Sequence, residues 1–313
     1  RCSAFEFDDV SALEPTEFDL YYRAGEHEYR YALSVHADKI VSEGLWRRKL
    51  GASRTAMLFE REGAEVELGP TLRKLVTAAR FNPSLPYLSF LCINFDAPVV
   101  KEAASWFLDG VFLNYNSSYL ERMLEQLLDE AESPEVTRFL RAVDVRIDGF
   151  RVEKSPEWRG QRVFVRHEVD GKGYELRLSE ESAGTQKLIG LAAYLMTALE
   201  RGSTVVVDEL DAKLHPKLLR YVILLFKDPA VNKNGAQLIF SSQDVSTMRN
   251  DVFRRDEIWF AARGEGEASQ LWSLADIHEA NGNLVSKNAA FDKQYLSGRY
   301  GADPYLTRIE EWD

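Results

Sequence analysis

Residues 203–211 read Ser-Thr-Val-Val-Val-Asp-Glu-Leu-Asp, an apolar run that ends in two adjacent carboxylates. The β-branched run Thr204 to Val207 is typical of a central strand buried on both faces of a parallel sheet. Open α/β sheets bind their ligands at the carboxyl ends of the strands, which is where Asp208 and Glu209 fall. Phosphoryl-transfer sites need one carboxylate on Mg²⁺ and a second group that orients or deprotonates the attacking water. We therefore predict Asp208 for the metal and Glu209 for the water; the alternative is a strand end whose acids are only solvated.

The segment before this strand predicts a capped helix. Apolar residues recur at helical spacing after Lys187, namely Leu188, Leu191, Ala192, Leu195 and Leu199. Ser182 stands where an N-cap residue belongs, so free backbone N–H groups and the positive end of the helix dipole should form an anion site there. An ordinary capped helix is the alternative interpretation of the same serine.

Two further elements follow the acidic strand end. His215-Pro216 predicts the start of a helix that runs to about Phe226, and Gln-Leu-Ile-Phe at 237–240 predicts a second buried strand. That strand ends in the polar run Ser-Ser-Gln-Asp at 241–244. A helix N-terminus, an acidic strand end, a crossover helix and a polar strand end thus follow one another, an order that chance rarely produces.

These segments carry a family resemblance. Residues 182–186, Ser-Ala-Gly-Thr-Gln, resemble the signature of ABC-type and SMC-type ATPases; residues 205–209 resemble the Walker B motif, and Leu210-Asp211 is similar to the D-loop. The motif Asp-Glu-Leu-Asp-Ala-Lys-Leu-His-Pro at 208–216 resembles a motif of AAA-type ATP-binding proteins of bacterial abortive-infection and anti-phage defence operons. The tail 293–304 resembles the same group, and the ATPase subunits of PARIS defence systems are the members that it resembles most.

The resemblance implies an α/β fold of the ABC-type, P-loop NTPase-like class, with an antiparallel β-subdomain and a helical insertion. It implies ATP and Mg²⁺ held between two subunits of a homo-oligomer, at least a dimer. The site residues that it implies are Asp208 for the metal, Glu209 and Gln243 for catalysis, and Ser182, Gly184, Gln186, Asp211 and His215 for the nucleotide. Ser182, Gly184 and Asp211 would act on the nucleotide of the neighbouring protomer.

The same resemblance implies a defence ATPase that senses a phage product and controls a toxic protein effector, such as a nuclease. A DNA-repair ATPase of the RecF or overcoming-lysogenisation type is a second interpretation. A scaffold that has lost nucleotide binding is a third.

Two departures from the family pattern bear on these alternatives. Residues 1–313 contain no Gly-x-x-x-x-Gly-Lys-Ser/Thr phosphate loop, and without it nothing cradles the β- and γ-phosphates. We expect the loop to precede Arg1, because in the family it lies before the β-rich segment. Gln243 stands where related ATPases carry a switch histidine. Glutamine can donate a hydrogen bond but cannot become cationic, so slow turnover is expected.

The composition limits where such a protein works. With 313 residues and 45% hydrophobic content, the chain can bury one large core or two moderate ones. Cys2 and Cys92 are too few and too far apart for a disulfide framework or a metal site, which favours the reducing cytoplasm. No apolar run approaches the length of a membrane helix, so no membrane partner is expected. A net charge of −11 argues against a broad nucleic-acid surface, although DNA binding through a local patch stays open.

Three regions are expected along the chain. Residues 1–70 predict a β-rich subdomain, with a hairpin over 18–22 and 29–35 and a third strand at 56–61. Residues 71–145 predict a helical insertion, with one helix through 119–128 and another from Ser133-Pro134. This insertion is either an arm that binds a partner or a subdomain that covers the sheet. Residues 146–313 predict the C-terminal ATPase lobe, which begins with strands at 147–152, 162–165 and 174–178.

Overall fold

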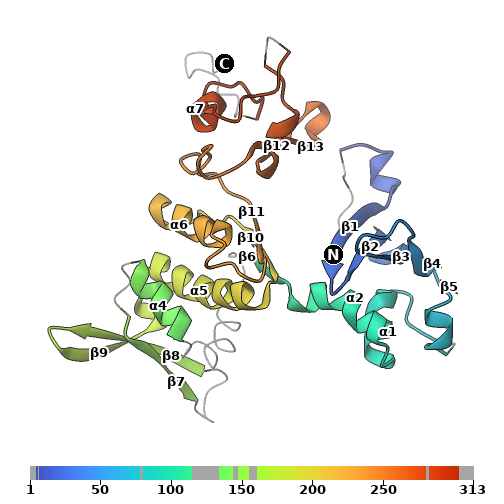
Figure 1. Cartoon of the computed structure of the whole chain (residues 1–313), viewed down its shortest axis with the longest axis horizontal. Helices are drawn as coiled ribbons and strands as arrows, with labels where there is room; N and C mark the ends of the chain where they lie inside the picture. Colours follow the sequence, from blue (N-terminus) through green and yellow to red (C-terminus); the bar gives the residue numbers. More distant parts are fainter. Residues whose placement is uncertain are drawn as a thin grey trace. The chain divides into compact units, whose positions relative to one another are not determined.

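The computed structural model of the chain describes residue 5 and residues 7–77, 80–114, 134–143, 147–154, 161–279 and 282–302. The chain forms two compact units. The first comprises residues 1–109 and 264–268, and the second comprises residues 110–263 and 269–313 (Figure 1).

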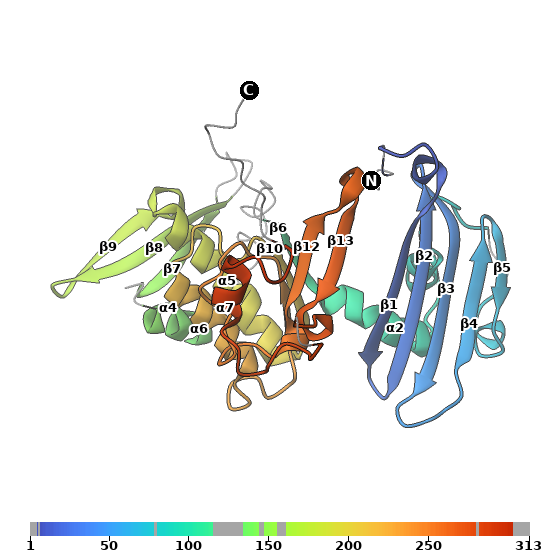
Figure 2. The same cartoon turned by 90° about the horizontal axis from the view of Figure 1, so that it is seen from above.

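The first unit is built on a five-stranded antiparallel sheet in sequential order (Figure 2). Its strands are β1 (Thr16–Ala24), β2 (His27–His36), β3 (Lys39–Lys49), β4 (Ala56–Glu62) and β5 (Glu65–Leu68). The short 3₁₀ turn η1 (Ser11–Leu13) precedes β1 in the chain, and η2 (Leu72–Lys74) follows β5. The hairpin and the strand at 56–61 that the sequence predicts are confirmed as β1–β2 and β4. The sequence pattern did not predict β3 and β5.

Two helices cover one face of this sheet, α1 (Tyr87–Asn94) and α2 (Pro98–Asp109). Strand register sets Tyr22 opposite Tyr29, and the two rings stack with centroids 5.5 Å apart. The Tyr22 hydroxyl donates a hydrogen bond to the Ala103 carbonyl of α2 at 2.7 Å. These helices lie in the segment predicted to be helical, and the core shows that they act as a covering layer for the sheet.

The second unit is built on a three-stranded parallel sheet in the order β11–β10–β6. The central strand is β10 (Thr204–Asp208), as predicted, and its neighbours are β11 (Gln237–Phe240) and β6 (Val111–Asn114). The strand β6 corrects the sequence interpretation, because it lies inside the segment 71–145 that predicted only helices. Four residues of Val-Phe-Leu-Asn are too few for a period to separate strand from helix, so the pairing with β10 decides.

Helices α5 (Ala183–Arg201) and α6 (Pro216–Lys227) pack on this sheet, and α4 (Pro134–Ala142) packs on α5. The predicted cap of α5 is confirmed at Ser182, and the helix start predicted at His215-Pro216 is confirmed, with His215 as the cap of α6. Predicted strands also recur as an antiparallel meander of β7 (Gly149–Lys154), β8 (Gln161–Val169) and β9 (Lys172–Arg177), followed by η3 (Leu178–Glu180). One core joins these elements through Val165, Leu191, Leu195, Val205 and Val222, all completely buried.

The C-terminal part of the second unit has a small core of its own. It comprises the hairpin of β12 (Trp259–Arg263) and β13 (Ser269–Ser273), the helix α7 (Phe291–Leu296), and the short 3₁₀ turns η4 (Arg255–Glu257) and η6 (Leu274–Asp276). The 3₁₀ turn η5 (Glu265–Glu267) falls in residues 264–268, which belong to the first unit. Phe260 stacks on Tyr295 with centroids 5.7 Å apart, and Trp272 Nε1 donates to the Tyr300 carbonyl at 3.2 Å. The aromatic residues of the tail motif therefore pack this core.

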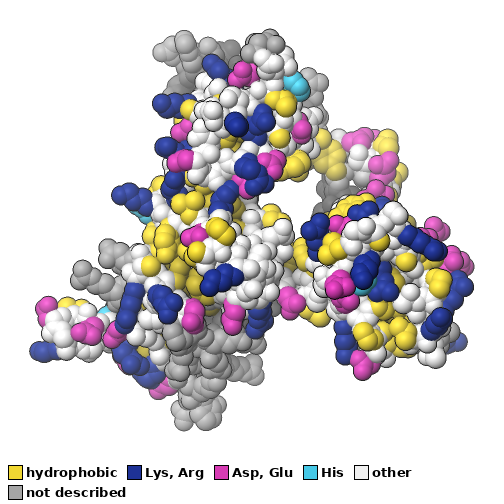
Figure 3. Space-filling view, in the orientation of Figure 1, with side chains coloured by type: hydrophobic (Ala, Val, Ile, Leu, Met, Phe, Trp, Pro, Cys, Tyr) yellow, Lys and Arg dark blue, Asp and Glu magenta, His cyan; other side chains and the backbone are white. Residues whose placement is uncertain are grey.

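Charges of both signs are interspersed over the visible face of each unit, while apolar side chains gather beside α6 (Figure 3). No helix among the described residues is long and apolar enough to cross a bilayer. The helix predicted over 119–128 lies outside the described residues, as do Cys2 and the last residues of the tail motif.

Candidate functional site at the ends of β10 and β11

The ends of strands β10 and β11 are cross-linked by one serine. The sequence prediction that β11 is buried is wrong: Gln237 and Ile239 are exposed and Leu238 and Phe240 are half-buried, because β11 is an edge strand of the described sheet. Parallel register pairs Val207 with Phe240, so Asp208 and Ser241 follow side by side at the carboxyl ends of β10 and β11. The Ser241 hydroxyl donates to Asp208 Oδ1 at 2.6 Å and accepts from the Glu209 backbone N–H at 2.8 Å. Ser241 thus orients the exposed Asp208 carboxylate and fixes the first backbone amide of the turn that follows.

Further hydrogen bonds join the residues that follow the two strand ends. Asp211 Oδ2 accepts from the Gln243 backbone N–H at 3.2 Å, and the Leu210 N–H donates to the Ser241 carbonyl at 3.0 Å. Asp211 Oδ1 is buried and has no hydrogen-bond partner among the described residues. The structure therefore brings Asp208, Glu209, Asp211 and Gln243 together at one edge of the sheet.

The turn after β10 has an unusual backbone. Glu209 and Lys213 have φ angles of +52° and +62°, in the left-handed region that non-glycine residues seldom adopt. Such residues cost about 1–3 kcal/mol each and persist where the surroundings over-determine them. Strained backbone is common at functional sites. Here it occurs in the turn at the carboxyl end of β10, where Asp208 and Glu209 follow one another.

The N-terminus of α5 borders this turn. Ser182 Oγ accepts from the Thr185 N–H at 3.1 Å and lies 2.8 Å from the Thr185 hydroxyl. A Cβ at Gly184 would lie 3.0 Å from the Lys213 carbonyl oxygen, so glycine allows the helix and the turn to approach closely. Ser182 is exposed and Gly184 is partly exposed, so the cap both stabilises the helix and presents its N-terminus.

Neighbouring polar groups fix the same helix start. Gln186 Nε2 donates to the Glu181 carbonyl at 2.7 Å, so this side chain folds back onto its own turn. The Glu181 carboxylate lies 2.7 Å from His167 Nε2 on β8. His215 Nδ1 accepts from the Lys217 N–H at 3.1 Å and so serves as the cap of α6. The nucleotide roles predicted for Gln186 and His215 stay predictions beside these local roles.

Lys187 lies beneath the turn, only 4% exposed. Its Nζ donates to the carbonyl oxygens of Glu209, Leu210 and Ala212 at 2.9, 3.0 and 2.5 Å. Burial lowers the pKa of Lys187 to about 8, an effect that Asp211 opposes.

The donors at the strand ends fit Mg²⁺ rather than a softer metal. Asp208 and Ser241 supply a carboxylate and a hydroxyl, and Mg²⁺ prefers oxygen ligands of this kind. It usually binds through one or two carboxylates together with phosphate oxygens and water, and the Asp208 carboxylate is exposed at the end of its strand. The residues present therefore fit a Mg²⁺ ion that arrives with a nucleotide.

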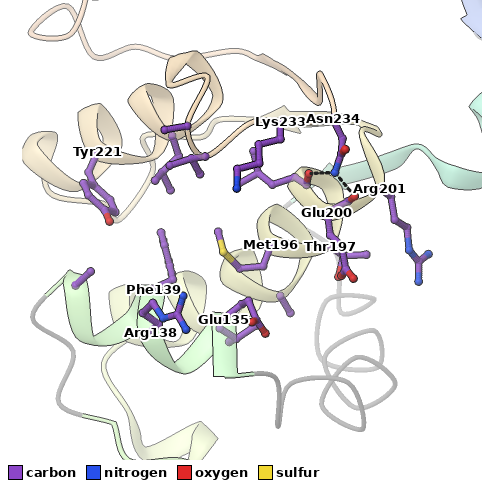
Figure 4. Close-up of a pocket in the computed structure, with 17 residues that line it drawn as sticks. Glu135, Arg138, Phe139, Met196, Thr197, Glu200, Arg201, Tyr221, Lys233 and Asn234 are labelled. Carbon is purple, nitrogen blue, oxygen red and sulfur yellow. Dashed lines mark hydrogen bonds between the residues drawn. The ribbon is translucent and has the colours of Figure 1, made fainter.

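A cavity of about 880 Å³ lies at the other end of α5 (Figure 4). Met196 and Thr197 line it from α5, with Phe139 from α4 and Tyr221 from α6. A helix rises about 1.5 Å per residue, so the 19 residues of α5 separate this cavity from the capped N-terminus. It is therefore distinct from the strand-end site.

Sequence reasoning missed two residues of this site. Ser241 was noted only as part of a polar strand end, although it contacts both Asp208 and Glu209. The sequence pattern marks Lys187 only as the start of a helical segment. The signal that could have found it is its spacing, since Lys187 precedes Leu191 and Leu195 by four and eight residues and so lies on the apolar face of the helix.

The family described as "AAA domain, putative AbiEii toxin, Type IV TA system" matches residues 4–249. Among solved structures, the chain is similar to the SMC head domain from Thermotoga maritima, with 12% identity and a TM-score of 0.33 over 80% of this chain and 74% of that chain. It is also similar to the SmcHead bound to the C-winged helix domain of ScpA, with 13% identity and a TM-score of 0.41 over 80% and 75% of the two chains. No curated protein matches the sequence.

Proposed function

Since the chain belongs to the AAA-domain family described as putative AbiEii toxin, type IV TA system, we propose that it is a Mg²⁺-dependent ATPase that regulates a toxic effector in anti-phage defence. The observation that carries the proposal is the cross-linked pair of strand ends. Asp208 and Glu209 follow the central strand in succession, and one hydroxyl, that of Ser241, contacts both residues. A phosphoryl-transfer site needs a carboxylate for the metal and a second group that orients or deprotonates the attacking water, and Asp208 and Glu209 can supply them.

Asp208 is the residue proposed to hold the metal. Its Oδ1 accepts the hydrogen bond from Ser241 at 2.6 Å, which fixes the plane of the carboxylate. Mg²⁺, when bound with ATP, would neutralise charge that develops on the phosphate oxygens. Ser241 lies on the neighbouring strand, so the position of Asp208 depends on the β10–β11 register.

Glu209 is the proposed general base. Its backbone N–H is anchored to Ser241, and its carbonyl accepts from Lys187, so both sides of the residue are fixed while its side chain is exposed. An exposed carboxylate on a fixed backbone can accept a proton from a water molecule that attacks the γ-phosphate. Gln243 is proposed to contact the same phosphate as a neutral hydrogen-bond donor, which fits slow turnover.

The N-terminus of α5 is proposed to complete the site of a second protomer. Ser182 and Gly184 are accessible at the start of a 19-residue helix, where backbone N–H groups and the helix dipole favour an anion. Two protomers would then hold two ATP molecules, each between the strand-end site of one subunit and the α5 N-terminus of the other. The proposed assembly is therefore a homo-oligomer of at least two subunits.

The proposed biological role follows from the family rather than from the site. A cytoplasmic ATPase of this kind would sense a phage product and hold or release a protein effector such as a nuclease. The resemblance of the tail to the ATPase subunits of PARIS systems supports this role. A scaffold without ATPase activity is the second candidate, because residues 1–313 contain no phosphate loop and Gln243 replaces the switch histidine.

Replacing Glu209 tests the proposal directly. Glu209→Gln should lower ATP turnover by a factor of about 100 or more, the size expected for a lost general base. ATP binding should persist, and the variant should stay dimeric in Mg-ATP because the nucleotide is not consumed. Turnover is measured by phosphate release, binding by thermal melting and assembly by light scattering.

Glu200→Gln is the matched control, since Glu200 lies at the other end of α5. Its turnover should equal that of the wild type. Glu209→Gln turnover within a few-fold of wild type would remove Glu209 from the role of base. If the wild type neither binds nor hydrolyses ATP, the scaffold interpretation is correct instead. Saturating ATP, at about one hundred times its dissociation constant, would otherwise raise the free energy of unfolding by about 2.7 kcal/mol.

A further inference from the structure

The turn that carries Glu209 and Asp211 encloses a buried ammonium group. Lys187 Nζ donates to three backbone carbonyls of this turn, those of Glu209, Leu210 and Ala212, at 2.9, 3.0 and 2.5 Å. A lysine ammonium has three N–H donors, and these three carbonyls match that number. These three contacts are to backbone atoms, so through them Lys187 acts on the course of the chain.

Lys187 lies on the side of α5 that faces the turn. Gly184 and Lys187 are three residues apart on α5, so they lie on the same side of the helix. Gly184 approaches the Lys213 carbonyl, at the end of the turn, and Lys187 contacts its beginning and middle. The N-terminal two turns of α5 therefore hold the whole turn after β10 from below.

The turn has a conformation that it would not adopt readily alone. Glu209 and Lys213 have positive φ angles without being glycine, and three carbonyl oxygens converge on one point. Converging carbonyl dipoles repel one another unless a cation lies between them. The ammonium of Lys187 supplies that cation, and it offsets the strain that places Glu209 at the edge of the sheet.

A buried charge of this kind is costly, which argues against simple packing as its purpose. Lys187 is 4% exposed, and the strongest effect on its pKa is the loss of hydration on burial. Asp211 and Glu209 favour the charged form, and Lys213 disfavours it. A leucine or methionine at this position would continue the apolar face of α5 at no such cost.

We propose that Lys187 is a positioning residue for ATP hydrolysis, which fixes the Glu209–Ala212 turn to the N-terminal turns of α5 and so holds Glu209 at its place beside Asp208. The inference rests on the proposed function of Glu209 and extends it to the residue that sets the backbone of that base. It also joins the two half-sites of one protomer, because the helix that carries Ser182 and Gly184 is the helix that holds Glu209.

Lys187→Met tests this role, with Lys233→Met as the matched control. Methionine keeps the length of the side chain and removes the charge and all three donors. Lys233 is an exposed lysine in the loop after α6, beside the cavity and outside the strand-end site. Both variants are compared with the wild type after thermal melting has shown that they are folded. Lys187→Gln replaces Lys187→Met if the latter does not fold.

The first measurement does not depend on ATP hydrolysis. The backbone amides of Leu210, Ala212 and Leu214 donate to backbone carbonyls within or beside the turn. Their hydrogen-exchange rates therefore report the local stability of the turn. In the nucleotide-free protein, Lys187→Met should raise exchange at these amides by about tenfold, the size of a modest loss of local stability. Lys233→Met should leave it unchanged. Equal exchange in Lys187→Met and wild type would overturn the proposal.

The second measurement separates positioning from stability. Lys187→Met should lower kcat for ATP by about tenfold or more, while KM stays within about threefold, because the base is misplaced and the nucleotide contacts are kept. Lys187→Arg should recover little, since its planar fork cannot direct three donors from one atom. Faster exchange with an unchanged kcat would also overturn the proposal. A wild type without ATPase activity would instead overturn the proposed function itself.

Discussion

Each compact unit buries one cation among its described residues, Arg61 in the first and Lys187 in the second, and the two are neutralised in different ways. Arg61 pairs with a carboxylate: its Nη1 lies 3.2 Å from Glu43 Oε2, and both side chains are completely buried. Arg61 also donates to the backbone carbonyls of Gly63, Pro83 and Leu85. Lys187 also donates to three backbone carbonyls, but these belong to one turn, and the carboxylate of Asp211 favours its charged form.

Glu43 completes the network in the first unit. It accepts from the Tyr31 hydroxyl at 3.0 Å and from the backbone N–H groups of Tyr87 and Leu88 at 2.6 and 2.9 Å. These two amides open α1, so the carboxylate caps the helix that covers the sheet. The pair therefore ties β3, β4 and α1 together with its charges balanced, which is a structural role.

The partners of a buried cation indicate whether its role is structural or functional. A buried charge with a fully hydrogen-bonded counter-ion holds elements together, and removing one partner exposes the other as an unpaired charge. A buried cation that donates to three carbonyls of one strained turn holds that turn, and the place of Lys187 beneath Glu209 indicates function. Three predictions follow from this contrast, in order of expected size.

Arg61→Met should lower the free energy of unfolding by about 3–5 kcal/mol, because Glu43 is left as an uncompensated buried charge. Denaturant unfolding measures the loss. Replacing both partners, as in Arg61→Met with Glu43→Leu, should recover part of it, since no unpaired charge remains. Arg30→Met is the control: Arg30 pairs with Asp19 on the exposed face of the sheet at 2.9 Å and should lose less than about 1 kcal/mol. A loss at Arg61 no larger than at Arg30 would show that the network is not structural.

The stability contributed by Lys187 should depend on pH. Its folded-state pKa of about 8 lies below the ordinary 10.5, so between these values the unfolded chain binds more protons than the folded one. Stability of the wild type relative to Lys187→Met should therefore rise as pH increases from about 8 to about 10.5 and be flat below pH 8. The expected rise is about 3 kcal/mol, since one pKa unit corresponds to about 1.4 kcal/mol. Denaturant unfolding of both proteins at several pH values measures it, and a difference that does not vary with pH would mean that burial leaves the proton affinity of Lys187 unchanged.

Gly184→Ala should have the smallest effect. Its Cβ would lie 3.0 Å from the Lys213 carbonyl, so the turn must shift by a few tenths of an ångström. A misplacement of about 1 Å can lower turnover by about a hundredfold, so a threefold decrease or thereabouts is expected. Gly173→Ala is the control, because a Cβ there meets nothing within 4 Å. Equal ATPase rates for the two variants would show that the approach of α5 to the turn is not critical.

The elements that the sequence predicted are those with strong local signals. β10 is predicted by its β-branched run, α5 by apolar spacing and the Ser182 cap, and α6 by the helix start at His215-Pro216. Two carboxylates directly after a buried strand indicate a ligand site from the chain alone. These signals involve residues close together in the sequence, so they can be interpreted without knowing what packs against them.

The tertiary structure decided the features that depend on distant residues. Val111–Asn114 becomes a strand only because β10 offers it a parallel edge, and Ser241 reaches Asp208 only through the register of β11 against β10. No local signal marks the positive φ of Glu209, since glutamate gives no sign of a left-handed backbone. Lys187 on the apolar face of α5 was visible in the sequence, but only the fold shows that three converging carbonyls of a strained turn are there to receive its charge.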